Sequence, residues 1–264
     1  MDSKKVYSTT KESLIGATIP LQTRTYKPVS HEQLMDLTLN SIQNAGFELD
    51  KELYTSSANG QIANGRFTIS NVTDRDMQLQ IGWQNSYNRQ LTLKFAIGAR
   101  IFICQNGAVS GDYGAFKKKH VGQVQTFTPA AITDYIKSAG DAFQRMQKER
   151  DIMKTIEVSP IRRAQIIGEM VIDKEMITPT QMNIISREIK RPTHDYGCEN
   201  SLWELYQYTT FAMKEEHPAL WMDKHISAHQ FFVNEAGILV QQQPDFEFNG
   251  PGNRKQLELF ELAL

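Results

Sequence analysis

Two stretches decide the fold class: Met77-Gln78-Leu79-Gln80-Ile81-Gly82-Trp83 and Leu91-Thr92-Leu93-Lys94-Phe95-Ala96-Ile97. In both, an apolar residue alternates with a polar or small one, which is typical of β-strands that have one buried and one wet face. This alternation extends from Phe47 to about Gly114, so the sequence predicts an antiparallel sheet of about four to six strands.

Turn signals and one apolar run set the expected strand boundaries. Asn59-Gly60, Asn64-Gly65 and Asn106-Gly107 indicate tight turns, because asparagine and glycine tolerate positive φ. Ile101-Phe102-Ile103-Cys104 has no polar residue, which predicts a central strand covered on both faces. We interpret Cys104 as a core residue rather than a reactive thiol.

Helical periodicity precedes and follows this sheet. Ser30 and Gln33 form a capping-box pattern for a short helix that ends near Gly46. After Thr128-Pro129, apolar residues recur at helical spacing for about 30 residues, which predicts one long helix with residues 148–151 on its solvated side. Further helices are expected to begin at Ser159-Pro160, Thr178-Pro179, Ser201 (a capping box with Glu204) and Pro218.

The expected fold class is therefore α+β, with an antiparallel β-sheet N-terminal half packed with helices, a helical C-terminal half and a flexible tail. The expected parts are a β-rich domain with one short helix (1–125), a helical region (126–240) and the tail (241–264). Gly, Pro and Asn in the tail are typical of linkers.

Bulk composition restricts the function classes. The net charge is −1, so any contact with nucleic acid must come from a local basic patch. Two distant cysteines favour a reducing compartment, and no apolar run is long enough to span a bilayer. Because the first residues are polar, unlike a signal peptide, we expect the protein in the cytoplasm.

The tail contains Gln256-Leu257-Glu258-Leu259-Phe260 after the linker. This pentapeptide resembles the bacterial sliding-clamp-binding motif, Gln-Leu-[Ser/Asp]-Leu-Phe, with Glu258 at the acidic position. The resemblance implies that the replicative clamp receives the apolar side chains in a groove. In the alternative, these residues pack on the body of the protein.

A second resemblance rests on segments 86–89, 98–107 and 119–122, and on the helix from Ser201 to Tyr206 with Thr209 or Thr210 and His217 after it. These segments are similar to the phage/plasmid-like protein family, the domain of unknown function numbered nine-three-two, which implies a bacterial host cell. The resemblance implies an origin on phages, plasmids or integrated elements, and it implies no particular activity.

The densest basic cluster is Lys117-Lys118-Lys119-His120. Together with Arg89 and Arg100, and with the aromatic residues Tyr87, Tyr113 and Phe116, it could follow a phosphate backbone while rings stack on bases. A solvated turn is the alternative. Arg162-Arg163, Arg187, Lys190 and Arg191 could form a second basic edge, although cations near a helix C-terminus also complement its dipole. The acidic joint 173–179 argues against a helix-turn-helix.

No catalytic or metal-binding residues are assigned. His225 and His229 share a helix face, but Ile226 stands where the zinc-protease pattern needs glutamate. Glu48, Asp74, Asp76 and Asp112 match no nuclease spacing, and no cofactor is predicted.

We therefore expect an accessory protein of phage or plasmid DNA replication or recombination, which binds the sliding clamp with its tail and single-stranded DNA with its body. Two alternatives remain open: a clamp-binding inhibitor of host replication that does not bind DNA, and a metal-dependent nuclease. The sequence leaves homo-oligomer formation open and predicts no membrane contact.

Overall fold

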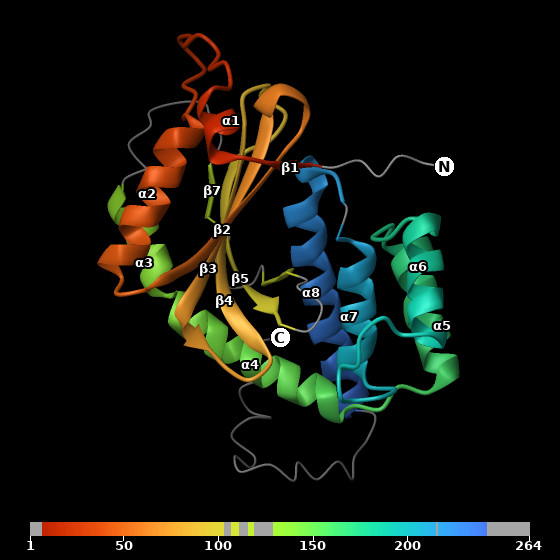
Figure 1. Cartoon of the computed structure of the whole chain (residues 1–264). Coiled ribbons are helices and arrows are strands. Elements are labelled where there is room, and N and C mark those ends of the chain that lie inside the picture. The colour runs from red at the N-terminus through yellow and green to blue at the C-terminus, as the bar shows by residue number, and fades with distance from the viewer. Residues whose placement is uncertain (1–6, 103–106, 111–115, 119–128, 215, 242–264) are drawn as a thin grey trace.

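The computed structural model describes residues 7–102, 107–110, 116–118, 129–214 and 216–241. Its centre is a seven-stranded antiparallel sheet with helices on both sides, which confirms the predicted α+β class (Figure 1). Strands β1 to β6 pair in chain order, and β7 also pairs with β5. The strands are β1 (Ser8–Thr9), β2 (Leu49–Ser56), β3 (Ile62–Thr73), β4 (Met77–Ser86), β5 (Leu93–Ile101), β6 (Gly107–Ser110) and β7 (Phe116–Lys118).

The helices lie in layers around this sheet. In Figure 1, α2 and α3 lie on one side of it, α8 and α7 on the other, and α5 and α6 lie beyond α7. Their bounds are α1 (Lys11–Ile15), α2 (His31–Asn44), η1 (Ala58–Gly60), α3 (Pro129–Lys137), α4 (Ala139–Thr155), α5 (Pro160–Gly168), the π-helix η3 (Glu169–Asp173), α6 (Pro179–Lys190), α7 (Leu202–Ala212) and α8 (Pro218–Gln241). None of the described helices is both long and apolar enough to cross a bilayer.

The predicted helix starts are largely confirmed. Ser30 and Gln33 form the expected capping box of α2, and Thr178 forms another with Gln181 at α6. Ser159 caps α5 at its Ser-Pro start. Only half of the box predicted at Ser201 forms, because the Glu204 carboxylate accepts from the Asn200 N–H instead.

The apolar face of the sheet carries the alternating residues that the sequence singles out. Cross-strand pairing places Phe67 opposite Ile81, and Ile81 opposite Ile97, and all three are fully buried. They share one hydrophobic cluster with Leu34 and Met35 of α2. Burial of this face is the main source of stability, at about 25 cal/mol per Å² of apolar surface.

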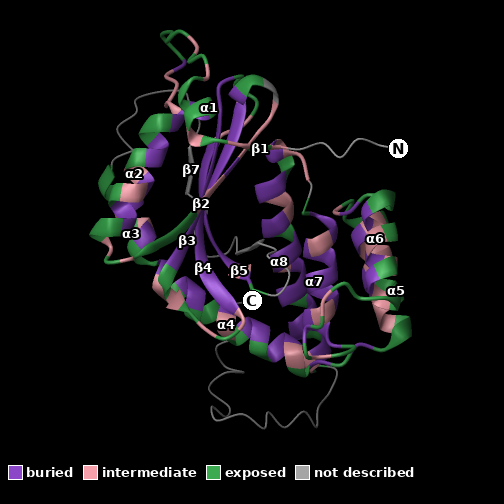
Figure 2. Ribbon diagram, viewed as in Figure 1, coloured by how far each residue is buried: buried purple, intermediate pink, exposed green. Residues whose placement is uncertain are grey.

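The opposite face was expected to be wet, and that prediction is wrong. Asn64, Gln84 and Lys94 lie in one cross-strand row, and all three are buried (Figure 2). The first turn of α8 lies over this row, where the Pro218 carbonyl accepts hydrogen bonds from the Asn64 and Gln84 amides, at 2.9 and 2.8 Å. Lys94 Nζ donates to Asp223 Oδ1 at 2.6 Å. The polar residues are therefore an attachment surface for α8.

One predicted turn is confirmed and another is wrong. Asn59 and Gly60 have φ values of 56° and 72°, as a tight turn requires. Asn64-Gly65, in contrast, lies inside β3. A Cβ atom on Gly65 would lie 2.5 Å from the indole of Trp83, so this glycine permits close packing rather than a turn.

The apolar run at the end of β5 also differs from the prediction. β5 ends at Ile101, and Phe102 is 39% exposed, so the predicted strand covered on both faces does not continue at Phe102. Cys104 and Asn106 lie outside the described residues.

The predicted long helix is two helices, α3 and α4, which separate at Ser138. The Ser138 hydroxyl donates to the Tyr135 carbonyl at 2.7 Å, which is the local competition with helical hydrogen bonding that serine offers.

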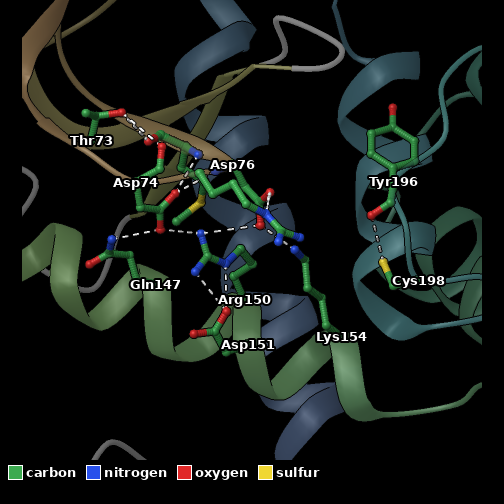
Figure 3. A network of polar contacts seen from close by, with 11 residues as sticks. Thr73, Asp74, Asp76, Gln147, Arg150, Asp151, Lys154, Tyr196 and Cys198 are labelled. Atoms are coloured by element: carbon green, nitrogen blue, oxygen red, sulfur yellow. Dashed lines mark hydrogen bonds and ion pairs between the residues drawn. The ribbon is translucent and has the colours of Figure 1, made fainter.

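The sequence predicts that residues 148–151 of α4 lie on a solvated face, and this prediction is wrong for two of the four. Glu149 and Arg150 are buried, whereas Lys148 and Asp151 are exposed. Arg150 Nη1 lies 2.5 Å from Asp74 Oδ2, in the β3–β4 turn (Figure 3). Gln147 Nε2 also donates to Asp74 Oδ2, and Lys154 pairs with Asp76. This hairpin network ties the turn to α4.

Candidate nucleic-acid interface

The structure separates the two arginines of the predicted DNA-binding patch. Arg89 lies in the turn after β4, with its guanidinium carbon 4.3 Å from the centre of the Tyr26 ring. Arg100 lies near the other end of β5, more than about 20 Å away along the strand. Its side chain is 18% exposed and lies 3.9 Å from Asp50. Arg89 and Arg100 therefore do not belong to one patch.

The described lysines of that patch lie at the Arg89 end. In β7, Lys117 pairs with Lys94 and Lys118 pairs with Leu93, while Lys119 and His120 lie outside the described residues. Tyr87 is 3% exposed, and its ring stacks on His31 with centroids 4.0 Å apart. Tyr87 is therefore a core residue and does not offer its ring to a base.

A second group of cations lines a cavity of about 830 Å³ between α6 and α7. Arginine and lysine predominate among its charged residues, with a single carboxylate. The lining residues, which together we call the basic pocket, are Ile184, Arg187, Glu188, Lys190, Arg191, Thr193, Phe211, Ala212 and Lys214.

The carboxylate of the basic pocket is already used to hold the fold. Glu188 is 6% exposed and accepts two hydrogen bonds from Thr193, one from the backbone N–H at 2.8 Å and one from the hydroxyl at 2.7 Å. These bonds fold the chain back after α6 and keep the next residues beside the pocket. Glu188 is therefore committed to the loop and offers little compensation for the cations around it.

All four cations are exposed, and three of them have no carboxylate partner among the residues that the structure describes. Across the described ranges, no ion pair forms at Arg187, Lys190 or Arg191. Arg187 and Lys190 lie in the last turn of α6, where the helix dipole favours positive charge. The dipole accounts for their helical position, and their convergence on a concave site adds a preference for anions.

An aromatic ring completes the pocket. Phe211 is half-buried; the ring of His194 lies 6.0 Å from its ring, and Lys214 Nζ lies 5.9 Å from its centre. Cations beside a partly open aromatic ring suit a ligand that joins a phosphate to a flat, stackable group.

The sequence revealed only part of this pocket. Arg187, Lys190 and Arg191 were recognised as a basic edge, but Phe211 and Lys214 come from the next helix and were missed. Lys214 lies two residues after Ala212, the last residue of α7, where a cation is expected from the dipole alone. No local pattern shows that the ends of two helices share one cavity.

The histidines considered as metal ligands are interior residues. His225 and His229 are both buried in α8. His229 Nε2 lies 3.1 Å from a Glu149 carboxylate oxygen, and the Tyr206 hydroxyl lies 3.3 Å from its Nδ1. Nowhere in the described segments do three or more His, Cys, Asp or Glu side chains form a group that could hold a metal ion.

Comparison with known proteins identifies the family. No curated protein and no solved structure matches the chain. One family model, described as Domain of unknown function (DUF932), matches residues 21–229, a range that includes α2, strands β2 to β7 and the basic pocket. Since this range is more than half of the chain, the protein belongs to the DUF932 family.

Proposed function

We propose that this protein is an accessory factor of phage or plasmid DNA replication or recombination. Its body binds single-stranded DNA in the basic pocket, and residues 256–260 bind the DNA sliding clamp. The observation that carries the DNA-binding proposal is the convergence of Arg187, Lys190 and Arg191 beside the Phe211 ring, with no described carboxylate paired to any of the three.

Single-stranded DNA suits this site better than duplex DNA. A strand with unpaired bases can place phosphates against the cations while one base stacks on Phe211, and such stacking contributes about 1–3 kcal/mol per base. The base faces in a duplex are already stacked, so they would not reach the ring. The pocket carries few cations, so we expect weak intrinsic affinity.

Clamp binding would make weak affinity sufficient. Tethering through Gln256, Leu257, Glu258, Leu259 and Phe260 would raise the local concentration of the body near DNA, which strengthens binding without a new contact. This peptide lies outside the described residues, so its support comes from the sequence pattern.

The body is tested with a fluorescent single-stranded oligonucleotide at low salt, read by anisotropy. Reversing two exposed charges of the pocket, K190E/R191E, should weaken binding at least about tenfold, because each substitution replaces attraction with repulsion. The double reversal K137E/K148E, on exposed positions of α3 and α4, is the matched control and should bind nearly as wild type. Equal binding by both double variants would refute the pocket as the DNA site.

The tail is tested by calorimetric titration of a sliding clamp with the full chain and with a chain that lacks residues 254–264. The truncated chain should lose clamp binding and keep its circular dichroism spectrum. Equal clamp affinity of the full and the truncated chain would mean that the tail is not the clamp-binding segment. If the full chain binds the clamp but no oligonucleotide, a clamp-blocking inhibitor becomes the better description.

A further inference from the structure

Arg66 lies on the polar face of the sheet, beneath the first turns of α8. It is a central residue of β3 and pairs with Leu53 on β2 and with Gly82 on β4. Its guanidinium carbon lies 4.9 Å from the centre of the Trp221 ring. Trp221 is 7% exposed and packs with Ala96, Met222 and Ile226 in a small cluster separate from the main core.

Within the described part of the chain, Arg66 has no carboxylate partner, in contrast to three other cations that are at least partly buried. Arg150 pairs with Asp74, Lys94 with Asp223, and Arg162 with Glu235, the last at 2.6 Å. Among the described residues, no ion pair or side-chain hydrogen bond forms at Arg66. Burial lowers the pKa of Arg66 to about 10, which still leaves the guanidinium charged at neutral pH.

Two buried acceptors without partners lie next to Arg66. Asn64 is two residues from Arg66 on the same face of β3, and Gln84 on β4 is the cross-strand partner of Asn64. Each donates its amide N–H to the Pro218 carbonyl, but Asn64 Oδ1 and Gln84 Oε1 accept no hydrogen bond within the described part of the chain. Buried acceptors of this kind are normally satisfied, by protein groups, water or a ligand.

We propose that Arg66, stacked on Trp221, is the anchor of a second ligand site, independent of the basic pocket, which binds a phosphate group. The ligand class is a phosphate that also carries hydroxyl or N–H donors, as inorganic phosphate and nucleotides do.

Stacking prepares Arg66 for this role. With its carbon 4.9 Å from the centre of the Trp221 ring, the guanidinium has one side covered by the indole, and its N–H groups can still form the two parallel hydrogen bonds by which arginine binds phosphate and carboxylate. Gly82, beside it on β4, has no side chain and leaves the guanidinium no polar competitor there. The phosphate would neutralise a charge that the ring only partly stabilises, and its donors would satisfy Asn64 or Gln84.

The site is tested on the full chain by titration with inorganic phosphate, with chloride exchanged to keep the ionic strength constant. Phosphate should give a saturable change in tryptophan fluorescence and raise the melting temperature of the wild-type protein. W221F should lose the fluorescence change and keep the thermal shift, which assigns the signal to the indole beside Arg66.

Three variants locate the effect. R66Q should lose both responses, and R66K, which keeps the charge without the fork, should bind phosphate about tenfold more weakly. R75Q, at a position that is 93% exposed, is the control and should respond as wild type. If R66Q does not fold by circular dichroism, R66K decides, and wild-type affinity in R66K would overturn the proposal. So would an equal response in a folded R66Q, or a wild-type protein that responds no more to phosphate than to chloride.

The source of the phosphate and the relation to the DNA site are separated in the same experiment. A mononucleotide that binds more tightly than inorganic phosphate indicates a nucleotide ligand, and equal affinity indicates the free anion. K190E/R191E should keep the full phosphate response, because it alters only the basic pocket. If K190E/R191E loses oligonucleotide binding but keeps the phosphate response, the two sites are independent of each other.

Discussion

The hairpin network on α4 and the basic pocket on α6 and α7 differ in whether their cations are paired with carboxylates. In the network, Arg150 and Lys154 each meet a carboxylate of the β3–β4 turn (Figure 3). In the pocket, Arg187, Lys190 and Arg191 surround a cavity, and its one carboxylate is committed to the loop after α6. Charges with partners hold this fold together, whereas charges without partners are available to a ligand.

The pKa of Asp74 shows how strongly the network favours its charged form. Burial alone would raise this pKa, but hydrogen bonds from Arg150, from the Asp76 N–H and from Gln147 outweigh burial and hold it below the ordinary value of 3.8. Stability from Asp74 is therefore present above its unfolded pKa and is lost as the pH falls through the lower, folded value.

The largest effect is expected when one partner of the network is removed. Arg150→Met leaves the Asp74 carboxylate without its cation and should lower the free energy of unfolding by about 3–5 kcal/mol. Urea unfolding measures this change. Lys148→Met, at an exposed position on the same helix, should change the stability by less than about 0.5 kcal/mol. Similar losses in both variants would mean that the Arg150–Asp74 ion pair does not stabilise the fold.

A buried imidazole should supply the next largest effect, as a pH dependence. Burial lowers the pKa of His31 to about 4, partly offset by its hydrogen bond to the Gly60 carbonyl. Between pH 6.5 and 4 the unfolded chain binds a proton that the folded protein excludes. The free energy of unfolding therefore decreases by about 3 kcal/mol as the pH is lowered through this range. His31→Gln should flatten the wild-type curve by about that amount. Parallel curves for the two proteins would place the pH dependence elsewhere.

The smallest effect on stability is expected in the basic pocket. Replacing Arg187, Lys190 and Arg191 by alanine removes no ion pair between described residues and relieves repulsion among like charges. Without DNA, the free energy of unfolding should therefore stay within about 0.5 kcal/mol of the wild-type value. A loss of several kcal/mol, as expected for Arg150→Met, would show that these cations stabilise the fold and would erase the contrast between the two regions.

The sequence predicted local elements well, because their causes are local. The alternation in residues 77–83 defines β4, and the caps at Ser30 and Thr178 define the starts of α2 and α6. These features depend on a strand or helix period and on neighbours within about four residues. They carry information about where an element lies and which of its faces is apolar.

The errors concern what covers each element. Gln84 and Lys94 look solvated until Pro218 and Asp223, more than a hundred residues later, are placed above them. From the sequence, Arg150 is expected on the helix surface, but in the fold it is covered by the β3–β4 turn and donates to Asp74. Gly65 looks like a turn residue until Trp83 is opposite it. Each error is a tertiary contact that no local period contains.

The candidate site was predictable only in part, for the same reason. Lys190 and Arg191 are visible as basic residues at the end of a helix, but their significance depends on Phe211 and Lys214 across the cavity. Arg89 and Arg100 are close in sequence but do not share one surface, because Arg89 lies in the turn before β5 and Arg100 lies near the far end of that strand.

The salt dependence of oligonucleotide binding is the sharpest test of whether the basic pocket binds the phosphates of DNA. For single strands, the slope of log Kobs against log salt is about −0.7 per neutralised phosphate, so the alanine triple variant of Arg187, Lys190 and Arg191 should have a slope shallower by about 2. We predict this shallower slope together with an unaltered free energy of unfolding. An unchanged slope would mean that these three cations do not meet phosphates, and the basic pocket would then not be the DNA-binding site.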